Sequence, residues 1–180
     1  YLQSYIQMIS YQDYKEELLE AAMKKDPSLK SKEEAVLYSP GIKALLSHYR
    51  AHELWIEGDY YEADEIAFKS RMETGIEIHP GAKIGRRTFI DHGMGIVIGE
   101  TAEIGEGCLL YHGVTLGAVA NKKGKRHPSV GNNVMLGAGS VLLGDIKVGD
   151  NVKIGANAVV LENVESNSTA VGAPARVIKR

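Results

Sequence analysis

The sequence has little of several residue types, and each shortage excludes a class of protein. A single cysteine among 180 residues excludes an intramolecular disulfide framework and a zinc cage of thiolates. No apolar run approaches the ~18 residues of a membrane span, and no signal peptide is visible. Lysine plus arginine number 21 and aspartate plus glutamate 23, so the net charge of −2 provides no basic footprint for nucleic acid or anionic membrane. We therefore expect a cytoplasmic protein without nucleic-acid or membrane partners.

Phenylalanine and tryptophan are also scarce, with 2 and 1 residues, whereas glycine is abundant and unevenly placed. Only Gly41 and Gly58 precede residue 70, and the other 18 glycines lie between Gly75 and Gly172. This asymmetry indicates two architectures that join near residues 72–76. The length suits one medium domain, or a core domain that carries a smaller lobe.

The N-terminal part mixes acidic, basic and apolar residues in a pattern that is typical of helices. Apolar residues recur at helical spacing up to a break at Asp26-Pro27. A second helix follows Ser39-Pro40, with proline as its first residue, and stops at Gly58. A third helix runs from about Tyr60 to Met72. We predict a helical domain over residues 1–72 that caps or oligomerises the rest of the chain.

The remaining sequence carries an internal repeat, because an aliphatic residue recurs every six positions from Ile78 onward. A small or branched residue follows four positions later in most units, and glycine often follows the aliphatic residue directly. Repeats that stay in phase like this are typical of a solenoid. The aliphatic positions are Ile78, Ile84, Ile90, Ile98, Ile104, Leu110, Leu116, Val130, Leu136, Leu142, Val148, Ile154 and Val160.

This repeat predicts a parallel β-helix of triangular section over residues 73–180. Each unit supplies one short strand and one sharp turn, and three units close a coil. The aliphatic side chain points into a thin interior and stacks on its counterparts in neighbouring coils. Glycine accepts the backbone angles that the turns require. With the helical domain in front of it, the fold class is α+β.

The repeat is interrupted in two places. An insertion around Gly93-Met94-Gly95 lengthens one unit by two residues. A polar stretch without aliphatic residues lies further on, and it predicts a loop at about 117–129. Breaks in a solenoid are places where sites are built.

Two pairs of polar residues adjoin these breaks. Asp91-His92 lies against the first break and Arg126-His127 lies within the second. A single surface histidine is common without any function. The clustering of both pairs at the breaks nevertheless favours a functional role.

The same segments resemble serine O-acetyltransferases, a family of hexapeptide-repeat acyltransferases. The specific likeness is carried by Asp91–Ala102 (DHGMGIVIGETA), Gly113–Gly117 (GVTLG) and Arg126–Pro128 (RHP). The closing Val171–Arg176 (VGAPAR) is shared by many hexapeptide acyltransferases, and the whole likeness covers about residues 26–178. The resemblance implies a left-handed β-helix. It also implies transfer of acetyl from acetyl-CoA to the L-serine hydroxyl, which gives O-acetyl-L-serine and CoA in cysteine biosynthesis.

The resemblance also implies the chemistry of the site. His92 corresponds to the general base, which takes the serine hydroxyl proton and later protonates the CoA thiolate. Free imidazole titrates near neutral pH, so it suits both steps. Glu77 stands where the family has an aspartate that orients this histidine.

The remaining acceptor residues follow from the same correspondence. Asp26 and Asp91 match the acids that hold the substrate ammonium. Arg126 matches the arginine whose bidentate fork binds the substrate carboxylate, and His127 completes the pocket.

For acetyl-CoA, the resemblance points to small residues that let the pantetheine arm lie close to the coils. Position 118, commonly glycine in the family, is alanine here. No metal is expected, and Cys108 is interpreted as a packing residue. The corresponding positions are Gly117, Ala118, Ala138 and Ala156, with Lys153, Arg176 and Lys179 as candidate phosphate contacts.

The family likeness carries expectations about partners as well. We expect a homotrimer with active sites between neighbouring prisms, and dimerisation of trimers stays open. L-Cysteine is the expected feedback inhibitor. The chain stops at Lys179-Arg180, directly after the repeats, so docking of a C-terminal tail into O-acetylserine sulfhydrylase is not expected.

Three alternatives remain open from the sequence. A hexapeptide acetyltransferase acting on a sugar or another hydroxyl or amine would share the fold and His92, without needing Asp26 or Arg126. A zinc carbonic anhydrase of the same fold would use three of the histidines in the repeats as ligands. A non-catalytic scaffold would leave both breaks unexplained.

Overall fold

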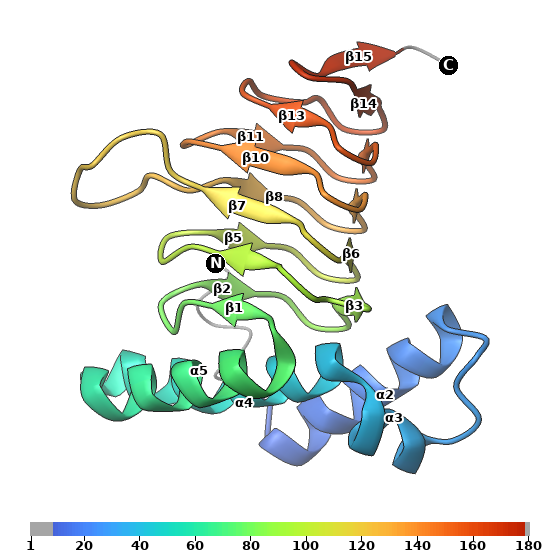
Figure 1. Cartoon of the computed structure of the whole chain (residues 1–180), viewed down its shortest axis with the longest axis vertical. Helices are drawn as coiled ribbons and strands as arrows, with labels where there is room; N and C mark the ends of the chain where they lie inside the picture. Colours follow the sequence, from blue (N-terminus) through green and yellow to red (C-terminus); the bar gives the residue numbers. More distant parts are fainter. Residues whose placement is uncertain (1–8, 179–180) are drawn as a thin grey trace.

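The computed structural model describes residues 9–178, in which helices precede a tall prism of short strands. Figure 1 shows the helices as a base beneath the first coil and the C-terminus at the far end of the prism. Among residues 9–178, none of the helices has the length and apolar character that crossing a membrane requires. The helices are α2 (Tyr11–Lys25), α3 (Lys32–Tyr38), α4 (Pro40–Glu57) and α5 (Tyr60–Thr74).

Each of these helices begins after a residue whose side-chain oxygen accepts a backbone N–H of the first turn. These residues are Ser10, Ser31, Ser39 and Asp59. The predicted start of the second helix at Pro40 and its stop at Gly58 are confirmed. The third helix continues two residues beyond Met72, because a left-handed Gly75 caps it.

Two parts of the helical domain differ from the prediction. Helix α3 was not predicted at all. The first helix starts at Tyr11, so Ile9 lies outside it, and the Ile9 carbonyl instead accepts a hydrogen bond from the Tyr49 hydroxyl at 3.0 Å. Part of that predicted helix falls on residues 1–8, outside the described residues.

The strands form three sheets, one on each side of the prism, and strands β1 to β13 pass through sheets A, B and C in turn. The coil is left-handed (Figure 1). Sheet A contains β1 (Glu77–Ile78), β4 (Val97–Ile98), β7 (Thr115–Gly117), β10 (Val141–Leu143) and β13 (Val159–Val160). Sheet B contains β2 (Lys83–Ile84), β5 (Glu103–Ile104), β8 (Ser129–Val130) and β11 (Lys147–Val148). Sheet C contains β3 (Phe89–Asp91), β6 (Leu109–Tyr111), β9 (Met135–Leu136), β12 (Lys153–Ile154), β14 (Thr169–Val171) and the antiparallel β15 (Arg176–Ile178).

The repeat positions stack as the sequence predicts. In sheet C, Ile90 pairs with Leu110, Leu110 with Leu136, and Leu136 with Ile154. Every aliphatic residue of the repeat is buried, and these columns form the core of the prism. Below, the three edges of the prism are named after the sheets that they join: A/B, B/C and C/A.

The helical domain is fixed to the first coils by specific contacts. Helix α4 packs on β3 at Gly41, where a Cβ would lie 2.7 Å from the Cβ of Ile90. His52 Nδ1 lies 2.7 Å from the Pro80 carbonyl oxygen. At the B/C edge, the Lys25 ammonium donates to the carbonyl of Gly107 at 2.8 Å. The helices therefore share a rigid boundary with the coils that carry the site candidates.

Candidate active site

His92 lies in the insertion at the C/A edge, between β3 and β4. Its φ of 62° is left-handed, a conformation that is uncommon for a residue with a side chain. The turn therefore directs the ring outward, and 74% of the side chain is exposed. Its Nε2 lies 3.7 Å from Asp91 Oδ1, and its ring centroid is 6.0 Å from that of His112. An exposed imidazole with a carboxylate beside it can accept a proton from a bound hydroxyl.

Small residues continue this edge above His92. The N–H of Gly139 donates to the carbonyl of His112, and the N–H of Asn157 donates to that of Ala138, at 2.9 and 2.8 Å. This ladder places His112, Ala138 and Ala156 one above another along the C/A edge. Two of the predicted cofactor residues therefore share one edge with His92.

The second candidate cluster lies at the A/B edge. Arg126 forms an ion pair with Glu100, and hydrogen bonding from Arg126 lowers the pKa of the Glu100 carboxyl. Lys125 donates to the carbonyl of Thr101 at 2.7 Å. The end of the loop, at Lys125 and Arg126, is thus bound to the corner of the coil beneath it. The guanidinium of Arg126 is held at that corner.

His127 is almost completely buried at this edge, with 7% of its surface exposed. Its ring packs on Gly99, where an added Cβ would lie 2.8 Å from Cε1. Burial, assisted by the positive charge of Arg126, lowers the pKa of His127. Both effects favour the neutral form of the ring.

The other acidic candidates lie elsewhere. Glu77 opens β1 beside the C/A edge, where its Oε2 pairs with Arg71 Nη1 at 3.0 Å. Asp26 follows α2 near the B/C edge and accepts hydrogen bonds from the N–H and the hydroxyl of Ser28 at 2.8 and 2.6 Å. No hydrogen bond joins either carboxylate to His92 within residues 9–178.

The remaining cofactor candidates are spread over the upper coils. Gly117 ends β7 at the A/B edge, and Ala118 follows it as an exposed residue of the loop. Lys153 lines a cavity of about 710 Å³ beside Asn151 and Thr169. Arg176 is exposed on β15, and Lys179 lies outside the described residues.

One chain does not bring the candidates together. The C/A edge carries Asp91 and His92, while the A/B edge carries Arg126 and His127. The full width of sheet A separates the two edges, since β4 runs from one to the other. The described residues of one chain therefore present two half-sites that face in different directions.

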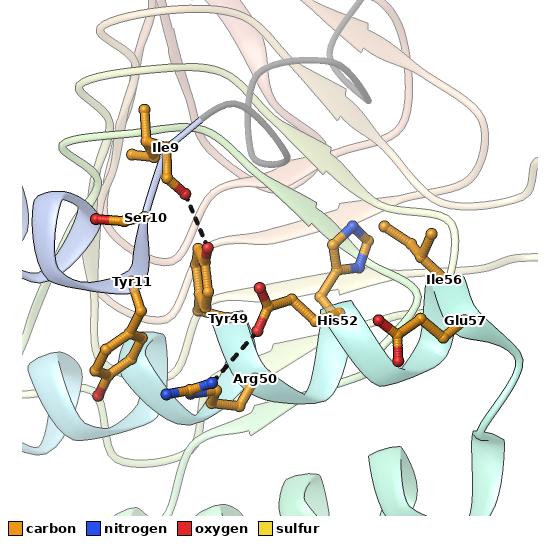
Figure 2. A pocket seen from close by; sticks show the side chains of 9 residues that line it. Ile9, Ser10, Tyr11, Tyr49, Arg50, His52, Ile56 and Glu57 are labelled. Carbon is orange, nitrogen blue, oxygen red and sulfur yellow. Dashed lines mark hydrogen bonds and ion pairs between the residues drawn. The ribbon is translucent and has the colours of Figure 1, made fainter.

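Neither the pocket on α4 nor a metal-binding cluster provides an alternative site within residues 9–178. The pocket in Figure 2, of about 380 Å³, lies on α4 and contains none of the candidates. Inside it, Arg50 stacks on the Tyr11 ring at 4.4 Å and pairs with Glu53 at 3.7 Å. Among residues 9–178, no three histidine, cysteine, aspartate or glutamate side chains converge as a metal site would require.

Comparison with known proteins now identifies the family. Residues 127–162 match the family model described as bacterial transferase hexapeptide (six repeats). A serine acetyltransferase of Helicobacter pylori (strain J99) is 55% identical over 90% of this chain and 95% of its own length. The chain belongs to the serine acetyltransferase family.

Solved structures of the family agree with this assignment. A serine acetyltransferase in complex with cysteine has a TM-score of 0.93 at 37% identity, over 98% of this chain and 73% of that one. The Neisseria gonorrhoeae enzyme in complex with serine has a TM-score of 0.91 at 34% identity, over 98% and 72%. The Brucella abortus enzyme in complex with coenzyme A has a TM-score of 0.90 at 37% identity, over 93% and 67%. The left-handed β-helix expected from the sequence is thus the fold of this family.

Proposed function

We propose that the protein transfers the acetyl group of acetyl-CoA to the hydroxyl of L-serine, giving O-acetyl-L-serine and CoA. The observation that carries this proposal is the pair of half-sites. One edge presents an exposed imidazole below a ladder of small residues, and the other presents a fixed guanidinium beside a neutral imidazole. A zwitterionic amino acid needs a negatively charged partner for its ammonium group and a positively charged partner for its carboxylate. Asp91 and Arg126 would supply these two charges.

We propose that His92 is the general base. Its imidazole takes the proton from the serine hydroxyl while that oxygen attacks the thioester carbonyl carbon. The carbon–sulfur bond then breaks, and the imidazolium returns the proton to the departing thiolate. Glu77 orients His92, which requires its carboxylate to leave Arg71 when substrate binds.

The acceptor pocket needs residues from two edges, so we propose that neighbouring chains supply them. The C/A edge of one prism would face the A/B edge of the next in a homotrimer. Asp91 would hold the serine ammonium, and Arg126 and His127 the carboxylate. Asp26 would hold the ammonium together with Asp91, which requires it to reach the cleft from its place near the B/C edge. Such a cleft buries a small substrate, which the flat side of a single prism cannot do.

The same cleft accounts for the cofactor and the inhibitor. Acetyl-CoA would lay its pantetheine arm along Ala138 and Ala156 on one chain and Gly117 and Ala118 on the next. Its phosphates would then contact basic residues of the upper coils. L-Cysteine differs from L-serine by one atom and would compete for the acceptor pocket. Because acetyl-CoA is an intracellular metabolite, we place the reaction in the cytoplasm.

The proposal is tested by CoA thiol release from acetyl-CoA with L-serine, D-serine, homoserine and several sugars as separate acceptors. We expect release with L-serine, inhibited by L-cysteine. Release with a sugar but not with serine would retain the fold and His92 and would overturn the roles of Asp26, Asp91 and Arg126. No release with any acceptor would overturn the proposal as a whole.

The choice of base is tested by two variants on the same edge. His92→Ala should lose roughly 10²–10⁴-fold in kcat, the usual contribution of a general base. His112→Ala is the matched control, because its ring is an exposed neighbour at 6.0 Å. Comparable losses in both variants would contradict the assignment of the base to His92.

A further inference from the structure

Thr101 occupies a central place at the A/B edge that the mechanism above does not use. Its Oγ1 accepts hydrogen bonds from the backbone N–H of Arg126 at 3.0 Å and of His127 at 3.1 Å. One hydroxyl therefore satisfies two successive N–H groups where the loop rejoins the coil. Loss of that hydroxyl would leave both groups without their acceptor.

Thr101 also fixes the hydrogen-bonding state of the His127 ring. The backbone N–H of Thr101 donates to His127 Nδ1 at 3.2 Å, and Thr101 Oγ1 lies 2.9 Å from the same nitrogen. A backbone N–H can only donate, so Nδ1 must keep its lone pair. The proton of the neutral ring is then on Nε2. An imidazolium would place two N–H groups against each other.

The Nε2 side of the ring is the free side. Within residues 9–178, Nε2 has no hydrogen-bond partner. The ring reaches its position because Gly99 has no side chain, since a Cβ there would overlap the ring. The charged and titratable groups that face His127 are Glu100 on the coil below, Arg126 and Lys125 on the loop, and His79 on the first coil.

We propose that Thr101 is a positioning residue that holds His127 neutral, with its proton on Nε2, as a hydrogen-bond donor to an oxygen atom of the acceptor amino acid. Gly99 supplies the space for this arrangement. His127 is then a donor beside Arg126 and not a second general base. The identity of the acceptor rests on the function proposed above. The tautomer of His127 and the hydrogen bonds from Thr101 that fix it do not depend on that function.

The ring state is measured directly by long-range ¹H–¹⁵N NMR of protein labelled at its 6 histidines, near neutral pH. The His127 signal is assigned by its loss in His127→Gln. We expect the neutral form with the proton on Nε2 in the wild-type protein. A proton on Nδ1, or an imidazolium, would overturn the proposal without bearing on whether serine is acetylated.

The role of Thr101 is measured with Thr101→Val, which removes the hydroxyl, and Thr101→Ser, which keeps it. Thr101→Val keeps the backbone N–H that donates to His127 Nδ1, so the tautomer should persist, but it removes the acceptor of the Arg126 and His127 N–H groups. The KM for serine should therefore rise by about tenfold or more, with a smaller change in kcat. Thr101→Ser should restore the wild-type KM. Gly99→Ala should raise the same KM by displacing the ring while every donor and acceptor remains.

Thr88→Val is the matched control, because the Thr88 hydroxyl also lies at a corner of the coil and donates to a backbone group, the Gly85 carbonyl, at 2.8 Å. It should lower the melting temperature without altering the KM for serine or the His127 signal. A Thr101→Val enzyme with the wild-type KM for serine would overturn the positioning role. Equal KM changes in Thr88→Val and Thr101→Val would also overturn it, because they would reduce the effect to general destabilisation.

Discussion

Helix α4 packs against strand β3 at Gly41 with no room for a side chain. In an exposed helix, alanine would be favoured over glycine by about 1 kcal/mol. Here a Cβ would lie 2.7 Å from the Cβ of Ile90 and 3.0 Å from its carbonyl carbon, and it would overlap the Ile90 carbonyl oxygen even more closely. Ordinary contact begins at 3.4 Å, so the helix and strand would have to separate by at least 3.4 − 2.7 = 0.7 Å.

Gly41→Ala is therefore expected to destabilise the protein. None of the clashing atoms can move by a change of rotamer, so the penalty falls near the upper end of the overpacking range, about 3 kcal/mol. Subtracting the helical preference leaves a net loss of about 2 kcal/mol. For a chain of this size that lowers the melting temperature by about 4–8 °C.

The assay is reversible thermal or urea unfolding of Gly41→Ala beside the wild-type protein. Lys43→Ala is the control on the same helix, because it removes only a surface ion pair of the partly buried Lys43 with Glu73, and the change should stay within about 1 kcal/mol. Strand β3 ends at Asp91, next to His92, so Gly41→Ala should also lower kcat. An unchanged or raised melting temperature would refute the packing argument.

Three further predictions follow from single residues. Arg126→Lys should raise the KM for serine by about tenfold or more, because a lysine cannot form a bidentate fork with a carboxylate; an unchanged KM would remove Arg126 from the pocket. Burial lowers the pKa of His48 from 6.5 to about 3, so the unfolded chain binds its proton first as the pH falls. The contribution of His48 to the free energy of unfolding should then be constant above pH ~6.5 and fall below it by up to about 1.4 kcal/mol per pH unit, and His48→Leu should remove that part of the slope in urea titrations. Leu136→Ala should cost about 3–5 kcal/mol, since the side chain is fully buried between neighbouring coils, and a loss under 1 kcal/mol would contradict the stacked core.

The β-helix could be predicted from the sequence because its interior admits few choices. Each coil is so thin that one aliphatic residue per side fills it, and the six-residue period appears directly in the chain. Even the insertion before Val97 leaves the stacking of Ile98 on Ile78 and Leu116 unchanged.

The helices were less predictable, because their pattern is weak. Helix α3 has only seven residues and one buried side chain, so it has almost no apolar periodicity. Its signal was the cap: the Ser31 hydroxyl accepts the N–H of Glu34 at 3.1 Å, and the Glu34 carboxylate accepts the N–H of Lys30 at 2.8 Å. A serine followed three residues later by glutamate is a known start signal.

The candidate site could be predicted only in part. The pairs beside the two breaks were found, because the breaks themselves are visible in the repeat. Their distribution over two edges depends on how many residues each corner takes, which the repeat alone does not fix. Thr101 was missed because a lone threonine carries no pattern, and its role appears only when the loop returns over it.

The central claim is that the C/A edge of one chain and the A/B edge of another form one site. It is tested most directly by mixing His92→Ala and Arg126→Ala chains, unfolded together and refolded, and measuring serine-dependent CoA release. Each variant alone should be nearly inactive at low serine concentration. Each mixed trimer then has one of its three interfaces with both edges intact, which is about a quarter of all interfaces in a random 1:1 mixture, so activity should return toward that fraction of the wild-type value. No recovery above the separate variants, in mixtures shown to contain mixed oligomers, would contradict a site shared between chains.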